Sequence, residues 1–281
     1  RYLNTFQNLE KLFGGKYLRD ITVKDFEQWY LDLKNDKLTR KNGKPYGQNT
    51  KSTYKIVIRS IWKWMKGNGE MFPAEVKSFR TEWKTPQPHA IKKSEVERLA
   101  NAFKDPRYRF AVMFLFDSGF RIDEFLTMKK RDLTVESRGN GEEYYSARCE
   151  VSKTVTRKIA VTLYPNAFSE YLRQYHAYTS NEEPLVNFRY EAFRKALDQR
   201  AMAVLGYRVT PHDLRKSSAT YYAPIIKDPF RLNKRYGWAL TSDVARHYLD
   251  ASGFTEEETI ELVEKNEVGT LKKQLDSEKS K

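Results

Sequence analysis

The hydrophobic positions of the first eighty residues recur every three or four residues, in three segments that glycine-rich or polar stretches separate. This spacing places the apolar side chains on one helix face, so we predict three helices here. A capping box formed by Thr22 and Asp25 marks the start of the second helix. Residues 35–48 contain too many Gly and Pro residues for a regular element, and we predict a loop. The apolar stripes are Leu3, Phe6, Leu9 and Phe13, then Phe26, Trp29, Tyr30 and Leu33, then Tyr54, Val57, Ile58, Ile61 and Met65.

The third predicted helix carries a second pattern, a row of basic residues at every fourth position. A solvated helix face is the ordinary explanation of such a row. Such faces usually include acidic partners four residues away, yet no Asp or Glu occurs from residue 37 to residue 69. We therefore predict that this row and the basic loop before it contact DNA phosphates. The residues concerned are Arg40, Lys41 and Lys44 in the loop, and Lys51, Lys55, Arg59 and Lys63 on the helix.

The hydrophobic pattern changes after a proline-containing stretch at residues 84–88, which predicts an extended linker. Ser94 and Glu97 form a possible capping box, and residues 110–116 are almost wholly apolar, as in a buried helix. Residues 144–151 and 158–163 alternate with a period of two around a short connection, which predicts a β-hairpin. Further helices are predicted from Pro165 and over residues 190–204.

These patterns predict a fold that is mainly α with a small antiparallel β-sheet, an α+β arrangement. The expected segments are a helical domain over residues 1–84, a linker over 85–93, a mixed second domain over 94–263 and a charged C-terminal tail over 264–281. The length of 281 residues is enough for two domains, each with its own core.

Charge and composition restrict the partners. The chain has 51 Lys and Arg residues against 37 Asp and Glu residues, a net charge of +14, which favours polyanions such as nucleic acid. An acidic substrate or a membrane surface stays possible, but no apolar run approaches the ~20 residues that cross a bilayer. The single cysteine, Cys149, excludes an intrachain disulfide and a thiolate-rich zinc site, and no secretory signal is visible. These features predict a reducing, intracellular environment.

Two short segments combine residues that suit anion binding. Thr210 and Pro211 mark the start of a helix whose first turns carry His212 and Arg215 on one face, near its positive end. An isolated pair of this kind is more often a surface histidine beside a solvated arginine. Arg121 follows a Gly-containing turn at the end of the predicted buried helix, where an ion pair to Asp123 or Glu124 would also explain it.

Taken together, these segments resemble the sequence boxes of the tyrosine recombinases, also called the phage integrase family. Residues 117–126 (DSGFRIDEFL) are similar to the family's first box, and residues 212–220 (HDLRKSSAT) to its second. Residues 236–238 (YGW) stand where the family has Leu-Gly-His/Trp, and Tyr248 follows inside ARHYL. The resemblance extends from about residue 94 to residue 254, and the basic helical domain before it is similar in kind to the family's core-binding domain.

The resemblance implies a site-specific DNA recombinase or integrase that cleaves and rejoins strands through a 3′-phosphotyrosine, without metal or other cofactor. Glu124 would orient the cations of the site, and the general acid would be Lys153 in the hairpin turn, with Lys158 as a rival. Lys216 stands where many members have another His, and the interval from Trp238 to Tyr248 is one residue longer than common. The implied catalytic residues are Arg121, Lys153, His212, Arg215, Trp238 and Tyr248.

The implied partners are double-stranded DNA and further copies of the chain, as a tetramer on two DNA sites, with no membrane. The expected location is the cytoplasm of a prokaryotic host, at the nucleoid. Two alternatives stay open: a type IB topoisomerase, which shares the tyrosine chemistry, and a catalytically silent DNA-binding accessory protein that has kept the fold.

Overall fold

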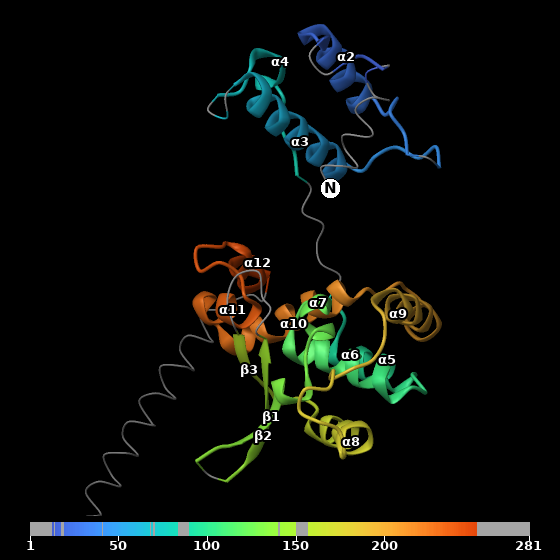
Figure 1. Ribbon diagram of the computed structural model, residues 1–281, viewed down its shortest axis with the longest axis vertical. Helices are drawn as coiled ribbons and strands as arrows, with labels where there is room; N and C mark the ends of the chain where they lie inside the picture. The colour runs from blue at the N-terminus through green and yellow to red at the C-terminus, as the bar shows by residue number, and fades with distance from the viewer. Residues whose placement is uncertain are drawn as a thin grey trace, which may run out of the picture. The chain divides into compact units, whose positions relative to one another are not determined.

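The computed structural model describes residues 13, 15–17, 20–40, 42–67, 69, 71–83, 90–139, 141–149 and 157–251. Its contacts divide the chain into two compact units, residues 1–87 and residues 88–281 (Figure 1). The division falls in the proline-containing stretch interpreted above as a linker. Most of the predicted first helix and the whole C-terminal tail lie outside the described residues.

The first unit contains α2 (Val23–Lys34), α3 (Gln48–Lys66) and α4 (Ala74–Lys77). The predicted capping box of α2 is present, because Thr22 Oγ1 accepts from the Asp25 backbone and Asp25 accepts from the Thr22 backbone at 2.9 Å. The apolar stripes of α2 and α3 meet in one core, where Phe26 and Trp62 lie edge to face with ring centroids 4.5 Å apart. Such aromatic pairs supply much of the burial that stabilises a small helical unit.

The predicted loop before α3 is partly ordered by its own backbone. Thr39 and Pro45 form an antiparallel bridge, and the Arg40 N–H donates to the Lys44 carbonyl at 2.9 Å. Arg40 and Lys44 are exposed on this turn, while Lys41 between them lies outside the described residues. The turn therefore presents basic side chains from a fixed backbone.

The expectation that the basic row on α3 is uncompensated is wrong at its N-terminal end. Lys51 and Lys55 are 8% and 5% exposed. Lys51 Nζ lies 2.7 Å from Asp36 Oδ1, a carboxylate that precedes the acid-free interval by one residue. Lys55 Nζ donates to the Arg80 carbonyl at 3.1 Å and lies 4.5 Å from the centre of the Tyr30 ring. Tertiary contacts from outside the helix thus occupy both ammonium groups.

In the second unit, α6 (Pro106–Ser118) is the central helix; the predicted stretch 110–116 is buried, and so are the two residues after it. It packs against α5, α8, α10 and β3. The other elements are α5 (Lys93–Asn101), α7 (Ile122–Leu126), the short 3₁₀ helix η2 (Lys130–Asp132), β1 (Leu133–Ser137), β2 (Glu143–Cys149), β3 (Arg157–Val161), α8 (Pro165–His176), α9 (Tyr190–Leu205), α10 (Pro211–Ile226), α11 (Pro229–Tyr236) and α12 (Val244–Ala251).

The three strands form an antiparallel sheet in the order β1-β2-β3, with Tyr145 opposite Val161 and Cys149 opposite Arg157. The predicted hairpin is therefore confirmed. The first strand, β1, was not predicted; of its five residues Leu133 alone is buried. The fold class, mainly helical with a small antiparallel sheet, is confirmed.

The start of α5 differs from the prediction. The helix begins at Lys93, and the Glu95 carboxylate accepts from the Lys92 backbone N–H at 2.9 Å. The capping-box interpretation of Ser94 and Glu97 is therefore wrong, because a Glu two residues earlier takes that position. Across the described ranges, no helix combines the length and the apolar character that crossing a bilayer requires.

Candidate active site

The turn between α6 and α7 fixes the first arginine. Gly119 ends α6 with a left-handed backbone, φ 62°, and a Cβ there would lie 2.2 Å from Tyr236 Cε1. Glycine is therefore required by backbone conformation and by close approach. Arg121 is the N-cap of α7, and its backbone N–H donates to Glu124 at 2.7 Å. The same carboxylate accepts from Arg121 Nη1 at 2.8 Å, so the turn holds both ends of Arg121.

The start of α10 fixes the second arginine. Thr210 is the N-cap and Pro211 occupies the first helical position, as the sequence predicts, and Asp213 completes a capping box with Thr210. Arg215, 4% exposed, donates to the backbone carbonyls of Gly119 and Tyr236, and these contacts tie α10 to the α6–α7 turn and to α11. Burial and the nearby guanidinium groups lower the pKa of Arg215 to about 10, so it stays charged at neutral pH.

His212 lies one turn before Arg215 and remains exposed. Its pKa lies below the ordinary value, because partial desolvation and then the charges of Lys216, Arg215 and Arg121 disfavour the imidazolium. At neutral pH its imidazole is therefore the neutral form, which can accept a proton.

The candidate nucleophile lies at the end of an aromatic stack. Trp238 stacks on Tyr236 with ring centroids 4.8 Å apart. Tyr248 stacks on Trp238 in turn, with ring centroids 5.6 Å apart and an interplanar angle of 5°. Tyr248 is on α12, which packs against α10 and α11 of the same chain. Burial raises the pKa of Tyr248, and the charge of Arg215 opposes that shift.

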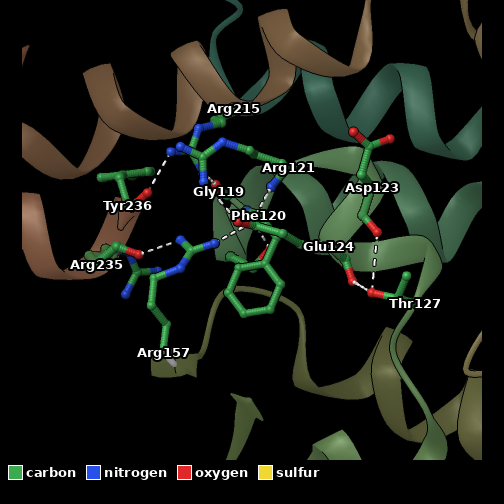
Figure 2. A network of polar contacts seen from close by, with 11 residues as sticks. Gly119, Phe120, Arg121, Asp123, Glu124, Thr127, Arg157, Arg215, Arg235 and Tyr236 are labelled. Carbon is green, nitrogen blue, oxygen red and sulfur yellow. Dashed lines mark hydrogen bonds and ion pairs between the residues drawn. The ribbon is translucent and has the colours of Figure 1, made fainter. Parts of the chain in front are cut away.

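A third arginine, which the sequence analysis did not select, belongs to the same network (Figure 2). Arg157 at the start of β3 has a side chain 2% exposed, and its Nη2 donates to Glu124 Oε2. Figure 2 shows the guanidinium groups of Arg121, Arg157 and Arg215 gathered beside Glu124 and the backbone of the turn. The signal that could have found Arg157 is strand alternation, because it shares the inward face of β3 with Ile159 and Val161.

The structure therefore brings together Arg121, Glu124 and Arg215 in one polar network, with His212 beside them and the Trp238–Tyr248 stack against Arg215. Lys153 lies outside the described residues. Lys158 is on the outward face of β3, and its Nζ lies 2.5 Å from Glu136 Oε1. Within the part of the chain that the structure describes, no three His, Cys, Asp or Glu side chains gather as a possible metal site.

Comparisons with known proteins agree with the boxes read from the sequence. The model of the phage integrase family matches residues 89–253. The tyrosine recombinase XerA of Saccharolobus solfataricus is 24% identical over 212 residues, 74% of this chain and 67% of the relative. The fold is similar to the XerH site-specific recombinase in its post-cleavage complex with palindromic difH substrate, with TM-score 0.68 and 15% identity over 93% of this chain and 78% of that one.

A lambda integrase dimer bound to a COC′ core site gives a TM-score of 0.64 at 17% identity, over 90% of this chain and 71% of that chain. These structural likenesses concern the fold, whereas the family match covers more than half of the sequence, including the turn with Arg121, the start of α10 and the aromatic stack. The chain belongs to the phage integrase family, that of the tyrosine recombinases.

Proposed function

We propose that this chain is a site-specific DNA recombinase in which Tyr248 attacks a backbone phosphodiester. The phenol loses its proton, its oxygen forms a bond to phosphorus, and the bond from phosphorus to the 5′-oxygen breaks. The products are a 3′-phosphotyrosine and a 5′-hydroxyl, which takes up a proton. The observation that carries this proposal is the meeting of Arg121, Arg215 and the Trp238–Tyr248 stack, from four separate elements, around one network.

The charges of the network suit this reaction. Arg121, Arg157 and Arg215 give three positive charges and Glu124 one negative charge, which leaves two in excess. A phosphodiester brings one negative charge, and attack by a phenolate raises this to two in the transition state. The second negative charge that develops in the transition state therefore meets cations that the bound substrate alone does not neutralise, which is the condition for electrostatic catalysis.

Arg215 is oriented for this task. Two of its five N–H groups donate to backbone carbonyls, which fix the plane of the guanidinium. Within the described residues Arg215 donates to these two carbonyls alone, so its other N–H groups can donate to a phosphate. Arg121 is 43% exposed and presents its guanidinium at the surface, where a duplex can reach it.

The proton transfers fall to two further residues. The neutral imidazole of His212 can accept the proton that leaves Tyr248, whose raised pKa makes unaided ionisation rare at neutral pH. Trp238 can donate its indole N–H to a phosphate oxygen but cannot move a proton. We assign protonation of the leaving 5′-oxygen to Lys153 by resemblance, and the outward position of Lys158 and its pairing with Glu136 support that choice over the rival.

Rejoining needs no external energy, because the number of phosphoester bonds is the same before and after cleavage. A 5′-hydroxyl from another strand can attack the phosphotyrosine by the reverse of the first step. Exchange between two duplexes requires at least one cleaving subunit for each exchanged strand, so we propose a tetramer on two DNA sites. We place the reaction at the nucleoid of a prokaryotic cell, where such a substrate lies.

For the first unit we propose phosphate contacts from the turn that carries Arg40, Lys41 and Lys44. Arg40 and Lys44 are exposed, so their charges can release counterions from a duplex. Arg59 and Lys63, half-buried over the Phe72 ring at 4.2 Å and 5.3 Å, are secondary candidates. Lys51 and Lys55 are the weakest members of the original set, because their ammonium groups already have internal partners.

The test is capture of the covalent adduct. The protein is incubated with a library of nicked duplexes of randomised sequence, and DNA that stays attached to protein in SDS is recovered and sequenced. We expect an adduct on a defined sequence, its loss in Tyr248→Phe and its retention in Tyr178→Phe, a control at a fully exposed tyrosine. Absence of any adduct would favour the accessory-protein alternative, and relaxation of arbitrary supercoiled plasmid would favour the topoisomerase alternative.

A further inference from the structure

Arg157 is a buried cation with a contact on each side. Its Nη2 donates to Glu124 on α7, and its Nη1 donates to the Arg235 carbonyl on α11 at 3.0 Å. The guanidinium carbon lies 4.8 Å from the centre of the Phe120 ring. Taking a guanidinium out of water is unfavourable unless a charge and hydrogen bonds compensate it. Because the cost of burying two charges can exceed the gain from their attraction, stability alone does not account for the buried position of Arg157.

We infer that Arg157 is a positioning residue of the active site: it holds the Glu124 carboxylate so that this carboxylate aims the Arg121 guanidinium at the scissile phosphate. The inference rests on the function proposed above and adds to it a residue that the sequence boxes do not include. Glu124 Oε1 accepts from Arg121 Nη1, and Oε2 accepts from the Arg121 backbone and from Arg157. Without Arg157, one side of this carboxylate loses the charged partner that fixes its plane.

The same guanidinium also supports the segment that leads to the nucleophile. Gly237 packs directly on the Arg157 side chain, and a Cβ at Gly237 would lie 2.8 Å from Arg157 Cδ and Nε. Gly237 is followed by Trp238, the ring on which Tyr248 stacks. Arg157 therefore contacts both Glu124, which orients Arg121, and Gly237, which precedes the aromatic stack. One side chain thus helps to fix the distance between the Arg121 guanidinium and Tyr248.

The charges around Glu124 affect the pKa of its carboxyl, which can be measured by titration. Arg121, Arg157 and Arg215 face the carboxylate within the network. A cavity of about 230 Å³ also has Glu124 in its lining, and the other titratable groups lining it are Lys129, Arg131, Asp132, Arg148 and Cys149. Burial alone would raise the pKa of Glu124, but the Arg121 backbone N–H and the charges of Arg157 and Arg121 hold it below the ordinary value.

The variants Arg157→Met and Arg157→Lys separate positioning from packing, because methionine keeps the bulk and loses the charge whereas lysine keeps the charge. The control is Arg138→Met, an exposed arginine in an ion pair with Glu142 at the end of β1. On the duplex recovered by adduct capture, we expect the single-turnover rate to fall about 10- to 100-fold in Arg157→Met, by analogy with the cost of removing the partners that orient metal ligands. Duplex affinity should change less than twofold, and Arg157→Lys should recover most of the rate.

A second readout needs no DNA. The ¹³C signal of the Glu124 carboxyl, assigned by its loss in Glu124→Gln, is titrated in the full chain. We expect the midpoint to rise in Arg157→Met, since the opposing charge is gone, and to stay near that of the parent protein in Arg157→Lys and Arg138→Met. If the Glu124 midpoint rises in Arg157→Met but the parent protein forms no adduct, the recombinase proposal is wrong while the interaction between Arg157 and Glu124 is still supported.

Two results would overturn the inference itself. One is an unchanged Glu124 midpoint in Arg157→Met. The other is a loss of rate in Arg157→Met that parallels a loss of melting temperature and is not restored by lysine, because such a result describes packing and not positioning.

Discussion

Replacing Gly119 by alanine tests the packing of the α6–α7 turn, which leads to Arg121, against Tyr236 of α11. The backbone at Gly119 is left-handed, and the added Cβ would lie 2.2 Å from Tyr236 Cε1 and 3.1 Å from Ser218 Oγ. Tyr236 has no exposed surface and its hydroxyl is hydrogen-bonded to Ser218 at 2.9 Å, so the ring cannot move aside without breaking this contact or displacing its neighbours. The substitution must therefore move either the α6–α7 turn or the aromatic stack.

The expected cost has two parts. A side chain in the left-handed region costs about 1–2 kcal/mol, and overpacking a well-filled interior costs about 1–3 kcal/mol more. The sum is about 2–5 kcal/mol. For a unit of this size each kcal/mol lowers the melting temperature by about 2–4 °C.

Gly206→Ala is the matched control, because Gly206 also ends a helix in the left-handed conformation, φ 80°, with nothing within 4 Å of its Cβ position. It should show the backbone cost alone, about 1–2 kcal/mol. Thermal unfolding followed by circular dichroism compares the two, and adduct formation should fall in Gly119→Ala only. Equal destabilisation of the two variants, with equal adduct yield, would refute the close approach of Tyr236 to the turn.

Four further outcomes are expected. Arg215→Ala should lower the single-turnover cleavage rate at least about 10²–10³-fold, the cost of one oriented donor to a transition state. In His212→Ala the logarithm of the cleavage rate should rise with pH, with slope about 1 up to pH 9, because attack then depends on ionisation of Tyr248, whose pKa is raised above 10.0. The cleavage rate of the parent protein should instead level off above pH 6.5, since the pKa of His212 is lowered from that value. Lys44→Gln should reduce the slope of log affinity against log salt by about 0.9, whereas Lys51→Met should lower the melting temperature of the first unit and leave that slope unchanged.

The parts of the site that sequence reasoning found are those with local causes. The N-cap Thr210 with Pro211 after it, and the glycine before Arg121, are properties of a few adjacent residues, so spacing alone predicts the two helix starts that carry His212, Arg215 and Arg121. The meeting of these residues with Tyr248 came from the family resemblance, because no local rule relates positions so far apart in the chain.

The parts that were missed have tertiary causes. Lys51 and Lys55 fit the pattern of a solvated row, but Asp36 and the Arg80 carbonyl reach them from outside the helix. Arg157 was missed because the predicted strand begins at residue 158, one residue later than β3 does, and because its partner Glu124 lies in another element. An inward position in the alternation of a strand is a signal for buried charge that could be applied to other sequences.

The excess of guanidinium groups has a consequence for the unliganded protein. Burial lowers the pKa of Arg215, and the charges of Arg121 and Arg157 lower it further, because the three guanidinium groups repel one another. This repulsion lowers the free energy of unfolding of the unit, and a bound anion offsets the repulsion by its attraction to each guanidinium. A phosphate of the substrate backbone therefore stabilises the second unit when it binds. Sulfate or pyrophosphate should likewise raise the melting temperature of this unit. Release of the rejoined duplex returns the protein to its less stable form.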